Sequence, residues 1–235
     1  MGDRRRWCAG PTGAAVRSAR VVRCPADGIE VIGEVVAPVN TERRSALADA
    51  AIMVLAERGL KGLTHRAVDA AAGEPVGTTS RYFRTREALL RGVATHCANQ
   101  LVGQLDAATG VTVGALSMDD LLDRLVQLID RAMTVNRART LAMMELFLEG
   151  TRSDDVRPTL AEATGAVFPV LRTLLESAGL RPTDRDVASL YSTVNGVVLT
   201  QLTLSADALG LGPDVSKDQV VRATIRAQLA AVPGR

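Results

Sequence analysis

Apolar residues recur with the spacing of an α-helix along most of the chain after position 40. The first such face contains Leu47, Ala50, Ala51, Val54 and Leu55, at positions i, i+3, i+4, i+7 and i+8. Asn40 or Thr41 can cap the start of this helix, and Gly59 stands where a left-handed residue ends a helix well. The pattern therefore predicts a helix from about position 41 to position 58.

Two short helices are predicted next along the chain. Thr64 can cap the first of them, which ends at Gly73. The other begins near Pro75, whose missing N–H costs nothing in a first turn. Its Thr79 and Phe83 are four residues apart, so both side chains point to the same, inward side.

The remaining pattern predicts a further helix capped by Thr85 and five more after it. Their expected spans are 118–136, 139–151, 156–179, 184–209 and 217–232. Thr183 with Asp186, and Ser216 with Gln219, have the spacing of capping boxes. We see no strand pair and no internal repeat, so the prediction is an all-α fold of about nine helices.

Residues 1–39 lack any sustained period and mix glycine, proline and arginine with short β-branched runs. We expect this segment to be mostly disordered, with a transient strand near Val31–Val36. An incorrectly assigned upstream start codon would also produce such a segment. The alternative is a basic arm that contacts DNA through Arg4, Arg5 and Arg6.

Charge separates along the chain more clearly than the formal net charge of +2 suggests. Residues 40–95 hold nine basic and six acidic side chains, whereas residues 96–235 hold thirteen basic and sixteen acidic side chains. A basic segment joined to an acidic body is typical of a module that faces a polyanion. Chance is the alternative explanation for so few charges.

Composition excludes several other classes of protein. Only 3% of residues are aromatic and 47% are apolar, which favours packed helices. No apolar run approaches the roughly 20 residues of a membrane span, and no apolar segment follows the basic start. Cys8, Cys24 and Cys97 show no metal-ligand spacing, so we expect reduced thiols in a cytoplasmic protein.

Few residues suggest catalysis. Of the two histidines, His65 lies in the first of the two predicted short helices and His96 lies among apolar positions. There is no glycine-rich phosphate loop and no HExxH motif. We therefore expect a protein that is not an enzyme, with no catalytic residue, no metal site and no cofactor.

The stretch from Gly73 to Leu90, "GEPVGTTSRYFRTREALL", carries the chemistry of a nucleic-acid contact. Two short helices around a glycine turn, braced by a longer helix, form a helix-turn-helix, which places its second helix in the DNA major groove. Hydroxyls, a guanidinium and a small apolar side chain then face outward. Arg81 is the best candidate for a bidentate contact with guanine.

The motifs "LTHRAVDAAAG" and "GTTSRYFRTREALL" resemble the DNA-binding region of the TetR family of transcriptional repressors, over about Thr41 to Val93. Glu74, where the family usually has an apolar residue, and Ser80-Arg81, where it often has aromatic residues, depart from the pattern. The resemblance implies roles for individual residues. Thr64 and Thr78 would contact phosphates; Arg66, Val76, Gly77, Ser80, Arg81 and Tyr82 would face the groove; Arg86 would contact the DNA backbone.

Some of these residues have a structural alternative. Thr64 caps a helix with or without DNA, Arg66 can be a solvated surface charge, and Tyr82 can be a half-buried amphipathic ring. The resemblance also implies a two-fold dimer and a variable helical C-terminal domain that binds an inducer.

The C-terminal body offers residues suited to a mostly apolar pocket. The soft apolar candidates are Met133, Met143, Met144, Phe147 and Phe168, and the polar candidates are Asn136, Glu145, Tyr191 and Asn195. Ordinary core packing is the alternative for each of them. The last two helices can build a four-helix dimer seam from their apolar residues, which are Val187, Leu190, Tyr191, Val194, Val197, Val198, Leu202, Val220, Val221, Ile225 and Leu229.

These patterns predict three segments: an extension over 1–39, a helix-turn-helix DNA-binding domain over 40–86, and a ligand-binding and dimerisation bundle over 87–235. The predicted function is a homodimeric, ligand-responsive repressor that a small, mostly apolar effector releases from a palindromic operator of double-stranded DNA. The alternative is a helical small-molecule-binding protein or enzyme that no longer binds DNA.

Overall fold

The structure is a computed structural model, which describes residues 19–23, 30–34, 41–109, 116–205, 207–210 and 214–234. The chain forms two compact units, Met1–Arg44 and Ser45–Arg235. The first contains an antiparallel hairpin of β1 (Ala19–Arg23) and β2 (Glu30–Glu34), with Val21 opposite Ile32.

This hairpin corrects the expectation that the chain has no strand pair. The two strands, ARVVR and EVIGE, are rich in β-branched residues, which favour extended backbone. Most of the segment predicted to be disordered, including Arg4, Arg5 and Arg6, lies outside the described residues.

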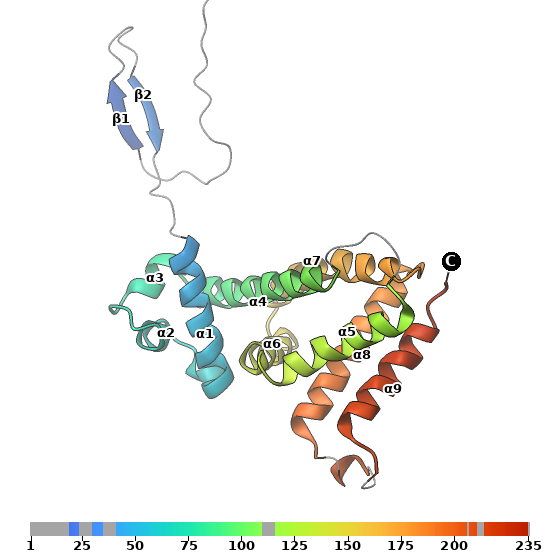
Figure 1. The fold of residues 1–235 in the computed structure, drawn as a ribbon. Helices are drawn as coiled ribbons and strands as arrows, with labels where there is room; N and C mark the ends of the chain where they lie inside the picture. Colours follow the sequence, from blue (N-terminus) through green and yellow to red (C-terminus); the bar gives the residue numbers. More distant parts are fainter. Residues whose placement is uncertain are drawn as a thin grey trace, which may run out of the picture. The chain divides into compact units, whose positions relative to one another are not determined.

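The described elements from Thr41 onward are helical, which confirms the predicted all-α class for this part of the chain (Figure 1). They are α1 (Thr41–Gly62), α2 (His65–Ala71), α3 (Thr78–Tyr82), α4 (Arg86–Thr109), α5 (Met118–Met133), α6 (Arg137–Gly150), α7 (Arg157–Ser177), α8 (Asp184–Thr203) and α9 (Lys217–Ala230), with a 3₁₀ turn at Asp207–Leu209. None of these helices is both long and apolar enough to cross a membrane.

Local signals set most helix starts. The predicted capping boxes of α8 and α9 are confirmed: Thr183 Oγ1 accepts from the Asp186 N–H at 3.3 Å, and Ser216 Oγ from the Gln219 N–H at 3.2 Å. Gly59 adopts the expected left-handed conformation, with φ of 61°, and bends the end of α1.

The end of α8 falls earlier than predicted, at Thr203 instead of position 209. Leu204 leaves the helical conformation, and the Lys217 ammonium donates to the carbonyls of Gln201 and Leu204, at 3.0 and 2.7 Å. This cation satisfies carbonyls that have no partner at a helix end. Because Lys217 lies 13 or more residues away, the apolar period of α8 does not reveal it.

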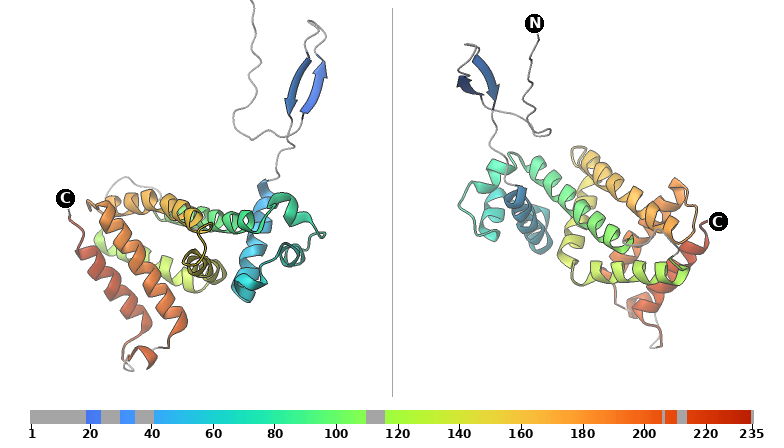
Figure 2. Two further views of the ribbon diagram at one scale, coloured as in Figure 1. Left: turned by 180° about the vertical axis from the view of Figure 1, so that it is seen from behind. Right: turned by 45° about the horizontal axis from the view of Figure 1, so that its top comes forward.

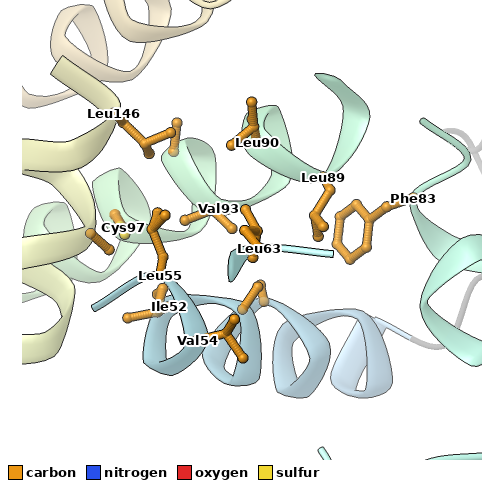
Figure 3. Packing of buried hydrophobic residues seen from close by; sticks show 14 of the residues in the cluster. Ile52, Val54, Leu55, Leu63, Phe83, Leu89, Leu90, Val93, Cys97 and Leu146 are labelled. Atoms are coloured by element: carbon orange, nitrogen blue, oxygen red, sulfur yellow. The ribbon is translucent and has the colours of Figure 1, made fainter. Parts of the chain in front are cut away.

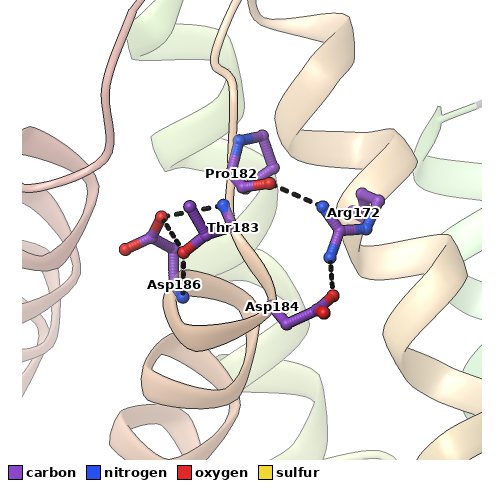
Figure 4. A network of polar contacts seen from close by, with 5 residues as sticks. All are labelled: Arg172, Pro182, Thr183, Asp184 and Asp186. Carbon is purple, nitrogen blue, oxygen red and sulfur yellow. Dashed lines mark hydrogen bonds and ion pairs between the residues drawn. The ribbon is translucent and has the colours of Figure 1, made fainter.

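The connection between α7 and α8 is fixed by a polar network (Figure 4). The Arg172 guanidinium of α7 donates to the Pro182 carbonyl at 2.5 Å and pairs with the Asp184 carboxylate. Thr183 and Asp186 form the adjoining cap. The arginine therefore holds the start of α8 against the side of α7.

The hydrophobic core divides into two clusters. One, the head cluster, is centred on the head, which comprises α1 to α3 and the start of α4, and it includes Leu47, Leu55, Leu63, Phe83 and Leu89 (Figure 3). The other, the body cluster, lies in the rest of the chain, among α5, α7, α8 and α9. Full burial of each such leucine contributes about 1.5–3 kcal/mol to the free energy of unfolding.

The head cluster also includes residues of two body helices, α6 and α7. Ala142 and Leu146 of α6, with Leu160 and Ala163 of α7, belong to it, and Figure 3 shows Leu146 together with the other buried residues of this cluster. Helix α4 runs from the head into the body and lies alongside α7 in all views (Figures 1 and 2). Helix α4 thus belongs to both the head and the body.

Gly92 of α4 leaves room for the largest head side chain. A Cβ atom added at Gly92 would lie 2.2 Å from Cε1 of Phe83, which is buried. Such a distance is far below van der Waals contact. The absence of a side chain at this position lets the end of α3 pack against α4.

Candidate nucleic-acid interface and ligand cavity

Helices α2 and α3 form the helix-turn-helix, and a buried carboxylate joins them. Asp69, which is 1% exposed, accepts hydrogen bonds from the Gly77 N–H (2.7 Å), the Thr79 N–H (2.6 Å) and the Thr79 hydroxyl (2.5 Å). Gly77 itself has φ of 93°, a left-handed conformation that suits glycine. Asp69 therefore fixes where α3 begins and which way it points.

The Asp69 carboxyl is ionised in this environment. Burial opposes its charge, but the hydrogen bonds from the Thr79 hydroxyl and from the backbone N–H groups of Thr79 and Gly77 outweigh burial, so the pKa of Asp69 is lowered. The sequence reading missed this residue. An acidic residue on the otherwise apolar side of α2, followed by Gly-Thr-Thr, is the signal that could have revealed it.

The turn before α3 differs from the predicted arrangement. Pro75 precedes the helix instead of lying in its first turn, and its carbonyl accepts from both the Thr78 N–H (3.1 Å) and the Thr78 hydroxyl (2.7 Å). The left-handed Gly77 separates Pro75 from α3. Five residues, Thr78–Tyr82, therefore make up the recognition helix.

The outward side of α3 and of the turn before it carries five of the predicted DNA contacts. Val76 is 81% exposed, Ser80 and Arg81 are exposed, and Gly77 and Thr78 are half-buried. The Ser80 hydroxyl donates to the Gly77 carbonyl at 2.9 Å. Inward Thr79 and Phe83 are buried, as predicted.

The other predicted contacts lie at the edges of this face. Thr64 is exposed and caps α2, accepting from the Ala67 N–H at 3.1 Å, and Arg66 is exposed on the same helix. Tyr82 is partly buried and packs against the head cluster. For Thr64 and Tyr82 the structure thus gives a structural role alongside the predicted one.

Arg86 has contacts that the sequence did not suggest. Its guanidinium donates to the carbonyls of Leu63 (2.5 Å) and Leu60 (2.6 Å), which lie just after the bend in α1. The side chain therefore ties the start of α4 to the connection between α1 and α2. Its predicted contact with the DNA backbone stays a prediction, and only its remaining donors are available for it.

Both histidines have structural partners. His65 Nε2 lies 2.6 Å from the Phe83 carbonyl and so links the start of α2 to the end of α3. His96 Nε2 lies 2.8 Å from Asp49 Oδ1 and joins α4 to α1, with Gln100 beside both. Among the residues described, no group of three His, Cys, Asp or Glu side chains is suited to a metal ion.

A cavity of about 140 Å³ lies in the body between α4, α5, α6, α7 and α8. Five predicted pocket residues line it: Met143, Met144, Phe147, Tyr191 and Asn195. The sequence reading missed most of its wall, which includes Cys97, Ala98, Leu101, Leu105, Leu125, Leu128, Ile129, Ala132, Arg139, Thr140, Ala163, Thr164, Val167, Leu171, Val194 and Val198.

Four predicted residues do not line this cavity. Met133 ends α5 and packs against the body cluster, and Asn136 stands at the N-terminal boundary of α6. The Glu145 carboxylate lies beside Gly59 of the head. Phe168 packs edge-on against the Tyr191 ring, with centroids 5.5 Å apart, and so supports a lining residue from behind.

Helical spacing could have identified more of the wall. Arg139, Met143 and Phe147 follow one another four residues apart on α6, and Cys97, Leu101 and Leu105 do so on α4. Cys97 is 2% exposed, and burial raises the pKa of its thiol to about 12. The thiol is therefore neutral, in agreement with its expected role as a small buried hydrophobe.

Most of the apolar residues predicted for a dimer seam pack within their own chain. Val198, Val221, Ile225 and Leu229 are 3% exposed or less and belong to the body cluster. A different face of α8 is exposed, with Ser192, Gly196, Leu199 and Thr203 spaced by four, three and four residues. On α9 the exposed residues include Ala223, Ala227 and Ala230.

Two family models match the chain. "Bacterial regulatory proteins, tetR family" covers residues 47–93, and "Tetracyclin repressor-like, C-terminal domain" covers residues 116–232. No curated protein sequence matches the chain. The first model spans the helix-turn-helix, and the second spans α5 to α9.

Solved structures show the same fold. The multidrug binding protein EbrR complexed with imidazole is 24% identical, with a TM-score of 0.57, over 82% of this chain and 96% of its own. A transcriptional regulator from Rhodococcus sp. Rha1 is 20% identical, with a TM-score of 0.62, over 80% and 95%. A TetR-family member from Streptomyces coelicolor A3 is 23% identical, with a TM-score of 0.58, over 80% and 98%.

The family models and the helix-turn-helix lead to one assignment. Members of this family are DNA-binding regulators and not enzymes. The chain belongs to the TetR family of transcriptional regulators.

Proposed function

We propose that this regulator is a homodimeric repressor that binds a palindromic operator in the cytoplasm and leaves it when a small, mostly apolar molecule enters the body. One observation carries the proposal: α4 supplies both a wall of the apolar cavity, through Cys97, Leu101 and Leu105, and a wall of the head core, through Leu89 and Val93. A molecule in the cavity therefore touches the helix on which the head is packed.

The proposed DNA contacts follow the exposed side of the helix-turn-helix. Arg81 reads a base edge. Val76 and Ser80 are exposed beside it, where Val76 can contact a thymine methyl group and Ser80 a polar base edge. Thr64 and Thr78 contact phosphates, Arg66 and Tyr82 flank the groove, and Gly77 allows close backbone approach. Arg86 contributes through its position at the start of α4.

The proposed dimer uses the exposed faces of α8 and α9. A Cβ atom added at Gly196 would meet nothing within 4 Å, so this face has space for a second helix. Small residues such as Gly196 and Ala227 allow close approach, and Leu199 supplies apolar area. Two copies then present two recognition helices to half-sites about 34–36 Å apart.

The proposed ligand response has support from the cavity and from the related fold. EbrR has been solved with imidazole and with ethidium, so this fold admits small molecules. The cavity of this chain is lined mainly by aliphatic, methionine and aromatic side chains. A differential affinity of about 1–3 kcal/mol between the two head arrangements is enough to change DNA affinity by about 5- to 150-fold.

A gel shift with DNA from upstream of the protein's own gene tests the DNA-binding half. We expect wild-type affinity to fall steeply with salt, and Arg81→Ala to cost about 1–3 kcal/mol per half-site with relaxed preference at one base pair. Arg152→Ala, at an exposed arginine after α6, is the matched control and leaves affinity unchanged. Absence of any salt-dependent shift would favour a small-molecule-binding protein without DNA activity.

A further inference from the structure

The cavity contains a single cation among apolar and neutral groups. Of the described residues that line it, Arg139 alone carries a formal charge, and the neutral polar ones are Thr140, Thr164, Tyr191 and Asn195. Thr140 already donates to the Ala132 carbonyl at 2.7 Å. A partly buried guanidinium in such surroundings is unusual, because charged side chains withdrawn from water are normally paired.

Arg139 has one hydrogen-bond partner among the described residues, and that partner is neutral. Its Nη2 donates to Gln104 Oε1 of α4 at 2.8 Å. No described carboxylate lies within ion-pairing distance of it. The neighbouring Cys97 thiol is not a counterion either, because burial raises its pKa to about 12.

Partial burial disfavours the charged form of this guanidinium. Loss of water lowers the pKa of Arg139 from its usual value, although an arginine stays protonated at neutral pH. The cation therefore lacks both full hydration and a negative partner. An anionic oxygen brought into the cavity would supply the missing partner through charge-assisted hydrogen bonds.

We propose that the effector of this regulator is an apolar molecule that carries one carboxylate, and that this carboxylate binds Arg139 in the cavity. This inference rests on the proposed function, since it names the class of ligand that the body recognises. The planar guanidinium suits a carboxylate because it offers two parallel N–H donors. The apolar portion occupies the volume between Leu101, Ile129 and Phe147.

The same contact links the ligand to α4. Arg139 lies in the first turns of α6, whereas Gln104 lies on α4 toward the end away from the head. A carboxylate that takes the guanidinium donors competes with the Gln104 amide oxygen. The bound ligand thus weakens the connection between α6 and α4 at the cavity.

Three probes of nearly equal shape test the ligand class: phenylacetate, phenylacetamide and 2-phenylethylammonium. A cavity of about 140 Å³ suits a single aromatic ring with a short polar end. By calorimetric titration of the full chain, we expect phenylacetate to bind about ten- to a hundredfold more tightly than phenylacetamide. The ammonium probe should bind more weakly than either.

Arg139→Gln removes the cation and keeps a polar side chain of similar reach. It should reduce phenylacetate affinity by at least about tenfold and leave phenylacetamide affinity nearly unchanged. Arg137→Gln is the matched control, because Arg137 lies two residues earlier on α6, is exposed and does not line the cavity. The control should bind all three probes as the wild type does.

Several results would overturn this inference. Equal affinity for the acid and the amide, tightest binding of the ammonium, or an equal loss of phenylacetate affinity in the Arg137→Gln control would each exclude Arg139 as a carboxylate anchor. Failure of all three probes to bind would exclude the cavity as a site for such molecules. The gel shift of the wild-type protein separates these outcomes from the proposed function, because it measures DNA binding with no ligand present.

Discussion

At the scale of single residues, two side chains behind the DNA-facing surface hold the helix-turn-helix in shape. Asp69 collects three donors from the turn and the start of α3. Arg86 collects two carbonyls from the connection between α1 and α2. Neither needs to touch DNA to matter for binding, because each fixes the position of residues that do.

Asp69→Asn should lower the free energy of unfolding by about 1–3 kcal/mol, since an amide nitrogen would face a backbone or hydroxyl donor in place of an acceptor oxygen. Operator affinity should fall as well, because α3 loses its orientation. Asp155→Asn, at an exposed carboxylate, is the control and should leave both unchanged. Chemical denaturation at pH 7 and the gel shift are the measurements.

The stability of the wild type and that of Asp69→Asn should depend differently on pH. The pKa of folded Asp69 is lowered, so its contribution to stability is present above the unfolded pKa of about 3.9 and is lost as pH falls through the folded value. Wild type should therefore lose more stability below pH 4 than Asp69→Asn does. Parallel acid curves for the two proteins would contradict this role for the carboxylate.

At the scale of elements, the packing of α3 against α4 depends on the absence of a side chain at Gly92. Gly92→Ala would place a methyl group 2.2 Å from Phe83, and the buried ring has little room to move. We expect a loss of about 1–3 kcal/mol in the free energy of unfolding, as for other overpacked cores.

Gly103→Ala is the control on the same helix. An added Cβ atom there meets nothing within 4 Å, so the change should stabilise the protein by about 0.5–1 kcal/mol through helix propensity alone. Thermal or chemical unfolding distinguishes the two variants. A stable Gly92→Ala would mean that Phe83 is not confined by α4.

The elements also show what a sequence can reveal. Helix starts with local caps, such as Thr183 and Ser216, could be predicted because the signal and its effect lie within four residues. The end of α8, the partners of Asp69 and the pairing of Arg139 with Gln104 depend on residues 8 to 35 positions apart. Periodicity identifies a buried face but not what that face is packed against.

The dimer seam illustrates the same limit. The sequence correctly marked α8 and α9 as broadly apolar, but the packing of one chain already uses Val198, Val221, Ile225 and Leu229. The faces left exposed are lined by small residues, which carry a weak sequence signal. The exposed faces that we propose for the seam could therefore be recognised only from the fold.

At the scale of the whole molecule, assembly can be tested through Leu199, which is 48% exposed on α8. Leu199→Asp should produce monomers in sedimentation experiments and abolish cooperative operator binding, because a charge would be buried in the proposed seam. Leu148→Asp, at a more exposed leucine of α6, is the control and should stay dimeric. A dimeric Leu199→Asp would place the seam elsewhere.

The head core has a consequence for how such a regulator can be recombined. Leu146 and Leu160, from α6 and α7, complete the cluster that surrounds Leu55 and Phe83. A chimaera that joins this head to an unrelated body at the start of α4 would leave apolar head residues facing water or foreign side chains. Functional exchange of DNA specificity would therefore require grafting the outward residues of α3 onto the intact chain, or co-transplanting the facing positions of α6 and α7.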